Sequence, residues 1–120
     1  ARLFTDEIRQ VCMADNLAAA LLELCAPGAP TGALHWAGAE PVSRYTLGRA
    51  IAARFGLPAE KLIVATQLAG TPLAAVRQHD LSLDLRPLCD VLATRPEPLA
   101  AQLERLAVPV DLREALARLA

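Results

Sequence analysis

The residues of this chain best suited to chemistry are its histidines, cysteines and single tyrosine. His35 lies in an apolar run and His79 precedes Asp80 in a polar stretch. Nothing places a nucleophile beside either histidine, so no Ser-His-Asp arrangement is predicted. The histidines and cysteines are separated by long, irregular intervals, which do not match a tetrahedral zinc site. We therefore expect no catalytic residue and no metal site in this chain.

Each histidine admits two roles. His35 is either a core or pocket-wall residue or a residue that touches a ligand. His79 either orients a substrate hydroxyl or is simply solvated. We keep His35 as a candidate for substrate binding.

The sequence contains no glycine-rich turn of the kind that holds a dinucleotide. Neither G-x-G-x-x-G nor G-x-x-G-x-x-G occurs. Such a turn brings backbone amides to the pyrophosphate of the cofactor. We therefore expect this chain alone to bind neither NAD nor NADP.

The clearest structural signal extends from Gly32 to Gly56. The apolar residues 33–37 predict a short strand buried on both faces. A polar turn follows, and Ser43 predicts the N-cap of a helix that Gly56 and Pro58 end. Strand, turn and helix in this order indicate an α/β unit.

The other elements are predicted from apolar spacing and helix caps. In the first half we expect a short strand over residues 8–13 and a helix capped by Asp15. A strand or extended connector over 61–68 is followed by a loop over 69–80 and by a brief helix capped by Asp84 and ended by Pro96. Two more helices are expected: one bears Leu99, Leu103 and Leu106, and the last starts at Asp111 with Leu112, Leu116 and Leu119 on one side. The fold class is therefore α/β, with few short strands and four to five helices.

Three segments together resemble the C-terminal part of extended short-chain dehydrogenases/reductases. They are LFTDEIR (residues 3–9) with DNLA (15–18), the glycine-bounded stretch through EPVSRY (40–45), and RQHDLSLD (77–84). Their order and spacing are most similar to those of the group that contains dTDP-4-dehydrorhamnose reductase and related sugar-nucleotide reductases and epimerases. The likeness covers residues 3–105.

This resemblance implies a Rossmann-like enzyme of which the chain is a C-terminal fragment. Residues 1–105 would form the substrate-binding part, and residues 106–120 a C-terminal helical extension. The activity implied is reduction of a nucleotide-linked sugar or similar carbonyl compound with NAD or NADP, which the missing portion of the parent protein would hold.

The resemblance also implies two ligand residues. Arginines at the positions of Arg9 and Arg77 contact the substrate diphosphate in sugar-nucleotide members, and a guanidinium fork suits that anion. Here an aromatic strand does not follow Arg9, and glutamine replaces the proline expected at Gln78. The alternative is that both arginines are surface residues paired with Glu7 and Asp80.

The catalytic Tyr-x-x-x-Lys pair of the family has only one lookalike, Tyr45 with Arg49. We expect Tyr45 to be a packing residue. An alternative function from a different class therefore remains open. The chain could belong to a non-catalytic regulatory or binding module, because the regulatory subunit of methionine adenosyltransferase has a similar reductase-like fold.

Composition limits the partners. With 12 basic and 13 acidic residues the formal charge is −1, which argues against binding to nucleic acid or to an anionic membrane. No signal peptide or membrane span is evident. Cys12, Cys25 and Cys89 are expected to be reduced thiols in a cytoplasmic protein. We also expect self-association through exposed apolar surface.

Overall fold

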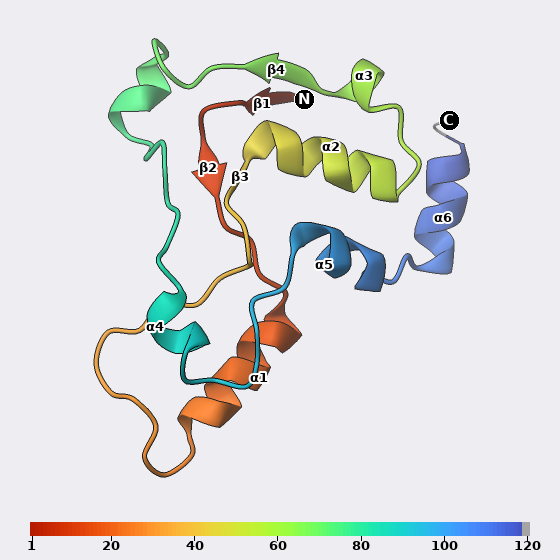
Figure 1. Ribbon diagram of the computed structural model, residues 1–120. Helices are drawn as coiled ribbons and strands as arrows, with labels where there is room; N and C mark the ends of the chain where they lie inside the picture. The colour runs from red at the N-terminus through yellow and green to blue at the C-terminus, as the bar shows by residue number, and fades with distance from the viewer. Residues whose placement is uncertain (119–120) are drawn as a thin grey trace.

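The computed structural model describes residues 1–118, and its elements form a mixed α/β structure (Figure 1). In chain order they are β1 (Arg2–Phe4), β2 (Ile8–Arg9), α1 (Ala14–Leu24), β3 (Val42–Ser43), α2 (Arg44–Arg54), α3 (Ala59–Leu62), β4 (Val64–Thr66), a 3₁₀ turn (Pro72–Ala75), α4 (Arg86–Cys89), α5 (Leu99–Arg105) and α6 (Val110–Ala117). The predicted α/β class is confirmed. The unexpected helix is α3, a single turn that precedes β4.

Two small sheets organise the upper part of the molecule in Figure 1. Strand β1 pairs with β4 in parallel, with Leu3 opposite Ala65. Strand β2 pairs with β3 in antiparallel, with Ile8 opposite Ser43. Helix α2 packs on β1, and Gly48 permits this because a Cβ there would collide with the Leu3 side chain.

Helix α2 forms as the sequence predicts. The Ser43 hydroxyl accepts a hydrogen bond from the Thr46 amide at 3.0 Å, which satisfies one of the free N–H groups of the first turn. After the last turn Gly56 adopts a positive φ of 67°, the conformation that glycine takes most easily at a helix end. Local signals therefore determine both ends of α2.

The strand predicted over residues 33–37 is wrong, because this segment is irregular in the structure. It is held instead by side chains and close packing. The Gln10 side-chain amide donates to the Gly38 carbonyl at 2.8 Å. A Cβ at Gly38 would collide with the Val11 carbonyl oxygen. The apolar character of residues 33–37 therefore indicated burial and not strand pairing. The burial is confined to the end of the run, where Ala37 is 4% exposed.

Several predicted boundaries also need correction. The strand expected over 8–13 is limited to β2. Asp15 does not cap α1, whose N-cap is Met13. Asp84 does accept a hydrogen bond from the Arg86 amide at 3.1 Å, but α4 ends at Cys89, well before Pro96. Helix α6 begins one residue before Asp111, and Leu119 lies outside the described residues.

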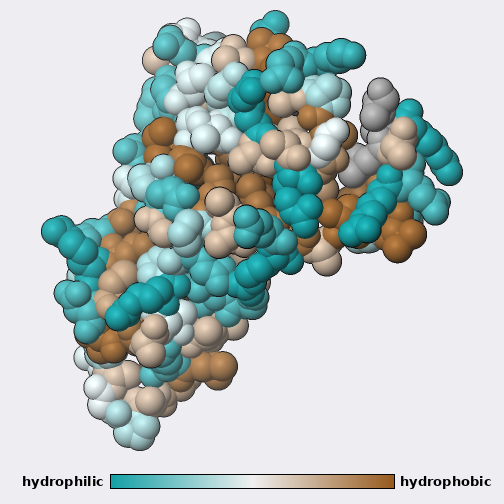
Figure 2. Space-filling model, turned by 45° about the vertical axis from the view of Figure 1, so that its right-hand side comes forward, coloured by the Kyte–Doolittle hydropathy of each residue, from teal (hydrophilic) through white to brown (hydrophobic). Residues whose placement is uncertain are grey.

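The molecule is flat and open. Its principal extents are 52 × 41 × 18 Å and its radius of gyration is 17.2 Å, whereas a compact domain of this length has a radius of gyration of about 14 Å. Its exposed area is 7785 Å², against roughly 6,200 Å² for a compact protein of this mass. Hydrophobic residues form a band across the middle of the face in Figure 2.

The clearest apolar core lies between α1 and α4, where Ala20, Leu88 and Leu92 are buried together. Trp36 packs against this cluster from the loop before β3. No helix within residues 1–118 combines the length and the hydropathy that a bilayer crossing requires.

Candidate functional site

Three arginines meet on one buried carboxylate, that of Glu7, which is 0% exposed. Arg9 Nη2 lies 2.6 Å from Glu7 Oε1, and Arg77 Nη2 lies 2.7 Å from the same oxygen. Arg44 Nε approaches Glu7 Oε2 at 3.4 Å. Three guanidinium groups against one carboxylate leave an excess of two positive charges at this arginine cluster (Glu7, Arg9, Arg44 and Arg77).

Backbone pairing brings these four residues together. The β2–β3 pair sets Arg9 beside Val42 and so places the first turn of α2 next to Glu7. The Arg44 amide donates to the Glu7 carbonyl at 3.0 Å. The segment after the 3₁₀ turn runs along β2, since the Ile8 amide donates to the His79 carbonyl at 2.6 Å. The cluster thus joins parts of the chain that are far apart in sequence.

The three arginines differ in the donors they have left. Arg9 also donates to the Ile8 carbonyl at 2.6 Å and to the Gln78 carbonyl at 3.2 Å, so both its Nη atoms are engaged. Arg77 directs Nε and Nη2 at Glu7 and lies over the Phe4 ring at 5.9 Å. Within the described residues neither Arg77 Nη1 nor the two Nη atoms of Arg44 donate a hydrogen bond. Arg44 and Arg77 are therefore the arginines best able to bind an added anion.

The polar loop beside the cluster is held by Asp6. Its carboxylate accepts from the Leu68 and Ala69 amides at 2.6 and 2.9 Å, and these two hydrogen bonds are the main reason that the pKa of Asp6 is lowered. His79 Nδ1 lies 3.7 Å from the same carboxylate. Asp80 instead accepts from the Ser82 amide at 2.8 Å, a bond that lowers the pKa of Asp80. Among residues 1–118 neither acidic group forms an ion pair with Arg77, whose carboxylate partner is Glu7.

The structure brings together two of the three predicted binding residues, Arg9 and Arg77. The alternative interpretation was that both arginines pair with Glu7 and Asp80. The pairing with Glu7 is present, whereas Asp80 makes no ion pair with either arginine. His35 is exposed in the irregular segment before β3, so its expected burial in an apolar strand is wrong. The roles of Arg9, His35 and Arg77 as ligand residues stay predictions.

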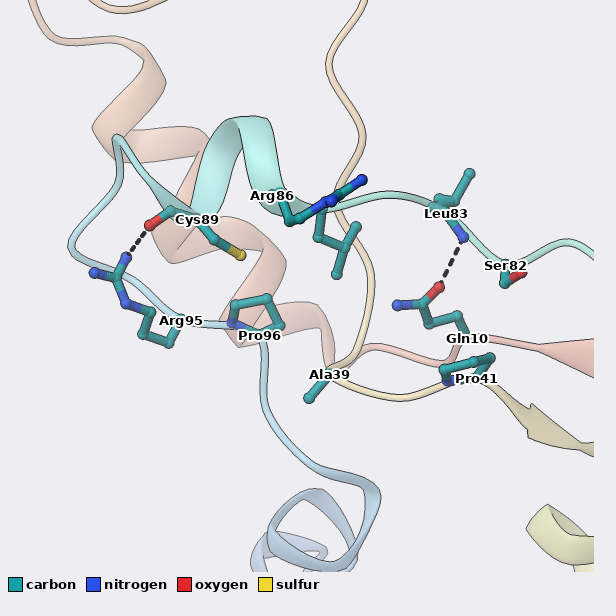
Figure 3. Close-up of a pocket in the computed structure, with 10 residues that line it drawn as sticks. Gln10, Ala39, Pro41, Ser82, Leu83, Arg86, Cys89, Arg95 and Pro96 are labelled. Carbon is teal, nitrogen blue, oxygen red and sulfur yellow. Dashed lines mark hydrogen bonds between the residues drawn. The ribbon is translucent and has the colours of Figure 1, made fainter.

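A hollow of about 580 Å³ lies between α4 with its flanking segments on one side and Gln10 with the loop before β3 on the other (Figure 3). The Gln10 side chain crosses its edge and accepts from the Leu83 amide at 2.9 Å. Arg86 borders the hollow but pairs with Asp84 at 2.7 Å, a contact that lowers the pKa of Asp84 to about 2. Arg95 also lines the hollow, and its Nη1 donates to the Cys89 carbonyl at 2.7 Å. Because Asp84 compensates the charge of Arg86, the hollow has a smaller excess of positive charge than the arginine cluster.

All three cysteines are free thiols. Burial raises the pKa of the Cys12 thiol, which keeps it in the less reactive protonated form. Within residues 1–118 no group of three or more histidine, cysteine or acidic side chains is arranged to hold a metal ion.

Tyr45 is placed against its own helix. Arg49 Nη1 lies 3.4 Å from the tyrosine hydroxyl, and the guanidinium sits 5.7 Å from the ring centroid. This contact, together with the Arg49–Glu60 pair at 2.9 Å, fits the packing role expected for Tyr45.

Glu7 and Arg44 are the residues of the cluster that sequence reasoning did not single out as site residues. Glu7 was weighed only as a partner of surface arginines. The signal for Arg44 was its position directly after the Ser43 cap, which places its side chain at the start of α2. No protein-family model matches the chain, and no curated protein matches it.

Proposed function

We propose that this chain is the substrate-binding portion of an NAD(P)-dependent oxidoreductase that acts on a nucleotide-linked sugar or a similar carbonyl substrate. The observation that carries the proposal is the arginine cluster, where three guanidinium groups from separate segments surround a single carboxylate. A nucleotide-linked sugar carries a diphosphate, whose oxygens are matched by guanidinium donors. The resemblance to sugar-nucleotide reductases supports the same substrate class.

In this proposal Glu7 orients the arginines and the arginines bind the substrate. Glu7 holds one edge of Arg77 through Nε and Nη2, which leaves the opposite edge for phosphate oxygens. Arg44 offers its two Nη atoms from the start of α2. Arg9 on β2 donates hydrogen bonds to the Gln78 carbonyl, which holds β2 beside that segment, and it adds positive charge to the site. Because the guanidinium groups are oriented before the ligand arrives, less conformational entropy is lost on binding.

The residues of this chain do not fit the dinucleotide cofactor, because no glycine-rich turn is available to approach its pyrophosphate. In the proposed parent protein another portion would hold NAD or NADP, which would supply the hydride for reduction of the carbonyl. The role of this chain is to bind and orient the substrate. A cytoplasmic location is part of the proposal, in keeping with three unpaired thiols.

Calorimetric titration of the chain with dTDP-glucose tests the proposal. Arg77→Ala should weaken binding by about 1.5–3 kcal/mol, the range for hydrogen bonds to charged groups. Arg77→Lys should recover only part of the loss, because an ammonium cannot reproduce the planar fork.

The matched control for this titration is Arg86→Ala, an arginine whose side chain is 86% exposed and paired with Asp84. It should bind dTDP-glucose as the unchanged protein does. Equal affinities for Arg77→Ala and Arg86→Ala would eliminate the diphosphate role.

The second candidate function is a non-catalytic regulatory or binding module with a reductase-like fold. It rests on the similar reductase-like fold of the regulatory subunit of methionine adenosyltransferase, because a shared fold does not settle function. A turnover assay distinguishes the two: a parent protein that binds nucleotide sugar but oxidises no NAD(P)H in its presence belongs to the regulatory class.

A further inference from the structure

An apolar groove runs along one side of α2, and Arg77 does not line it. It consists of two adjoining hollows, of about 290 and 300 Å³. Three apolar residues line both hollows: Val11, Leu47 and Ile51. Arg9 and Arg44 stand in the wall of the first hollow, whereas the second has no charged residue in its wall.

The groove has a direction and a length. Arg44, Leu47, Ile51 and Phe55 recur at intervals of three or four residues, so they share one face at α2 and its C-cap. From Arg44 to Phe55 this face extends over roughly 16 Å, at 1.5 Å per residue. Helix α5 lies beside α2 (Figure 1) and closes the far end of the groove through leucine side chains.

The charge is confined to one end. The Arg44 side chain is 45% exposed and reaches Glu7 only through Nε, at 3.4 Å. Its Nη atoms donate no hydrogen bond to any residue among 1–118, so they can meet a ligand at the mouth of the first hollow. Beyond this end the wall is apolar up to α5. The groove is thus complementary to a molecule with one anionic end and one apolar chain.

We propose that this groove binds a single-chain anionic amphiphile, with its carboxylate or similar head on Arg44 and its alkyl chain along Leu47, Ile51 and Phe55. A chain of about ten to twelve carbons matches the length of the apolar face. Hollows of this size lie at the lower limit of small-molecule pockets, about 300 Å³, so a narrow alkyl chain fits them better than a helix of another protein. This ligand differs from the nucleotide sugar, and Arg77 lines neither hollow. Both ligands use the Nη atoms of Arg44, so they compete for that residue.

Titration of the whole chain with decanoate tests the proposal, with decanol as the probe without charge and acetate as the probe without a long chain. Decanoate should bind at least about tenfold more tightly than either, because only it uses both the charged end and the apolar wall. Equal binding of decanoate and decanol, or no binding of decanoate, would overturn the proposal.

Two variants locate the ligand. Arg44→Gln should weaken decanoate binding about tenfold and leave decanol binding unchanged. Its control is Arg86→Gln, at an arginine that is 86% exposed and lines neither hollow; this change should alter neither affinity. If Arg44→Gln binds decanoate as Arg86→Gln does, the head is not held at Arg44 and the proposal fails.

Ile51→Glu introduces a carboxylate at the wall shared by both hollows, and Ile51 is 37% exposed, so the helix can accept the change. This variant should lose decanoate binding, since the new charge repels the ligand and interrupts the apolar wall. Leu22→Glu, at a leucine that is 74% exposed on α1, is the control and should bind normally. Unchanged binding by Ile51→Glu would contradict the proposed path of the chain.

Discussion

Two carboxylates anchor two regions of this molecule in different ways. Glu23 on α1 accepts hydrogen bonds from the Ala93 and Thr94 amides, both at 2.7 Å, and from the Thr94 hydroxyl. Glu7 accepts from guanidinium groups, and its Oε2 has no hydrogen-bond partner.

The two contacts differ in the N–H groups that remain free once the carboxylate has accepted its hydrogen bonds. Backbone amides that bond to Glu23 have no further donor, so this contact only holds the 93–94 segment against α1. Each arginine on Glu7 has several N–H groups, and those of Arg44 and Arg77 that do not face Glu7 stay free for another anion. A structural contact and a potential binding site thus differ in the nature of the donor.

The largest expected effect is that of Glu7→Gln, which removes the charge that holds three arginines together. We expect the free energy of unfolding to fall by about 3 kcal/mol, at the low end of the range for breaking a buried ion pair because the arginines are partly exposed. Urea denaturation measures it.

Glu60→Gln is the control for this measurement, since the Glu60 side chain is 73% exposed in its pair with Arg49. Its stability should change by less than about 0.5 kcal/mol. A Glu7→Gln protein that is no less stable than Glu60→Gln would show that the arginine cluster does not organise its region.

Leu88→Ala probes the other region through its apolar cluster. Leu88 is 2% exposed and the change should cost about 2–3 kcal/mol, since the open surroundings allow part of the cavity to collapse. Leu22→Ala on the exposed side of α1 should be close to neutral. If Leu88→Ala is equally neutral in thermal or urea unfolding, the α1–α4 region is not held by its apolar contacts.

Ser43→Ala should have a smaller effect, about 1 kcal/mol, because it removes the hydroxyl that caps α2. Hydrogen exchange should speed up at the Thr46 amide, which the hydroxyl protects at 3.0 Å. Ser43→Asn restores a capping oxygen and should recover the stability. Unaltered exchange at Thr46 in Ser43→Ala would mean that α2 begins without help from this cap.

Glu23→Gln should have a small effect at neutral pH, because glutamine keeps one acceptor oxygen for the 93–94 segment and loses only one of the two amide contacts, where its NH2 group faces an N–H donor. The substitution should mainly change how the free energy of unfolding depends on pH. Hydrogen bonds from Thr94 and Ala93 lower the pKa of Glu23 from 4.5, so its contribution is complete above pH 4.5 and is lost as pH falls through the folded-state pKa. Urea midpoints across this range should show a weaker acid dependence in Glu23→Gln than in the unchanged protein; identical curves would contradict the assignment.

Elements with local signals could be predicted from the sequence, whereas irregular packing could not. Helix α2 was predicted with its Ser43 cap and Gly56 stop, because each acts within one turn of the backbone. The apolar run before β3 was misread as a strand, since apolar character reports burial and not the hydrogen-bond partner. Pairing of residues 33–37 would have required a neighbouring strand that the chain does not place there.

The sequence by itself determined the α/β class, the course of α2 and the presence of arginines suited to an anion. Only the tertiary structure decided that Arg9, Arg44 and Arg77 share Glu7, and that Arg44 stands at the end of an apolar groove. The reason is physical: a cap acts between residues three positions apart, whereas Arg77 reaches Glu7 across a separation of 70 residues. Such a contact depends on how β2 pairs with β3 and on where the 77–81 segment runs, and neither is encoded in the spacing of the arginines.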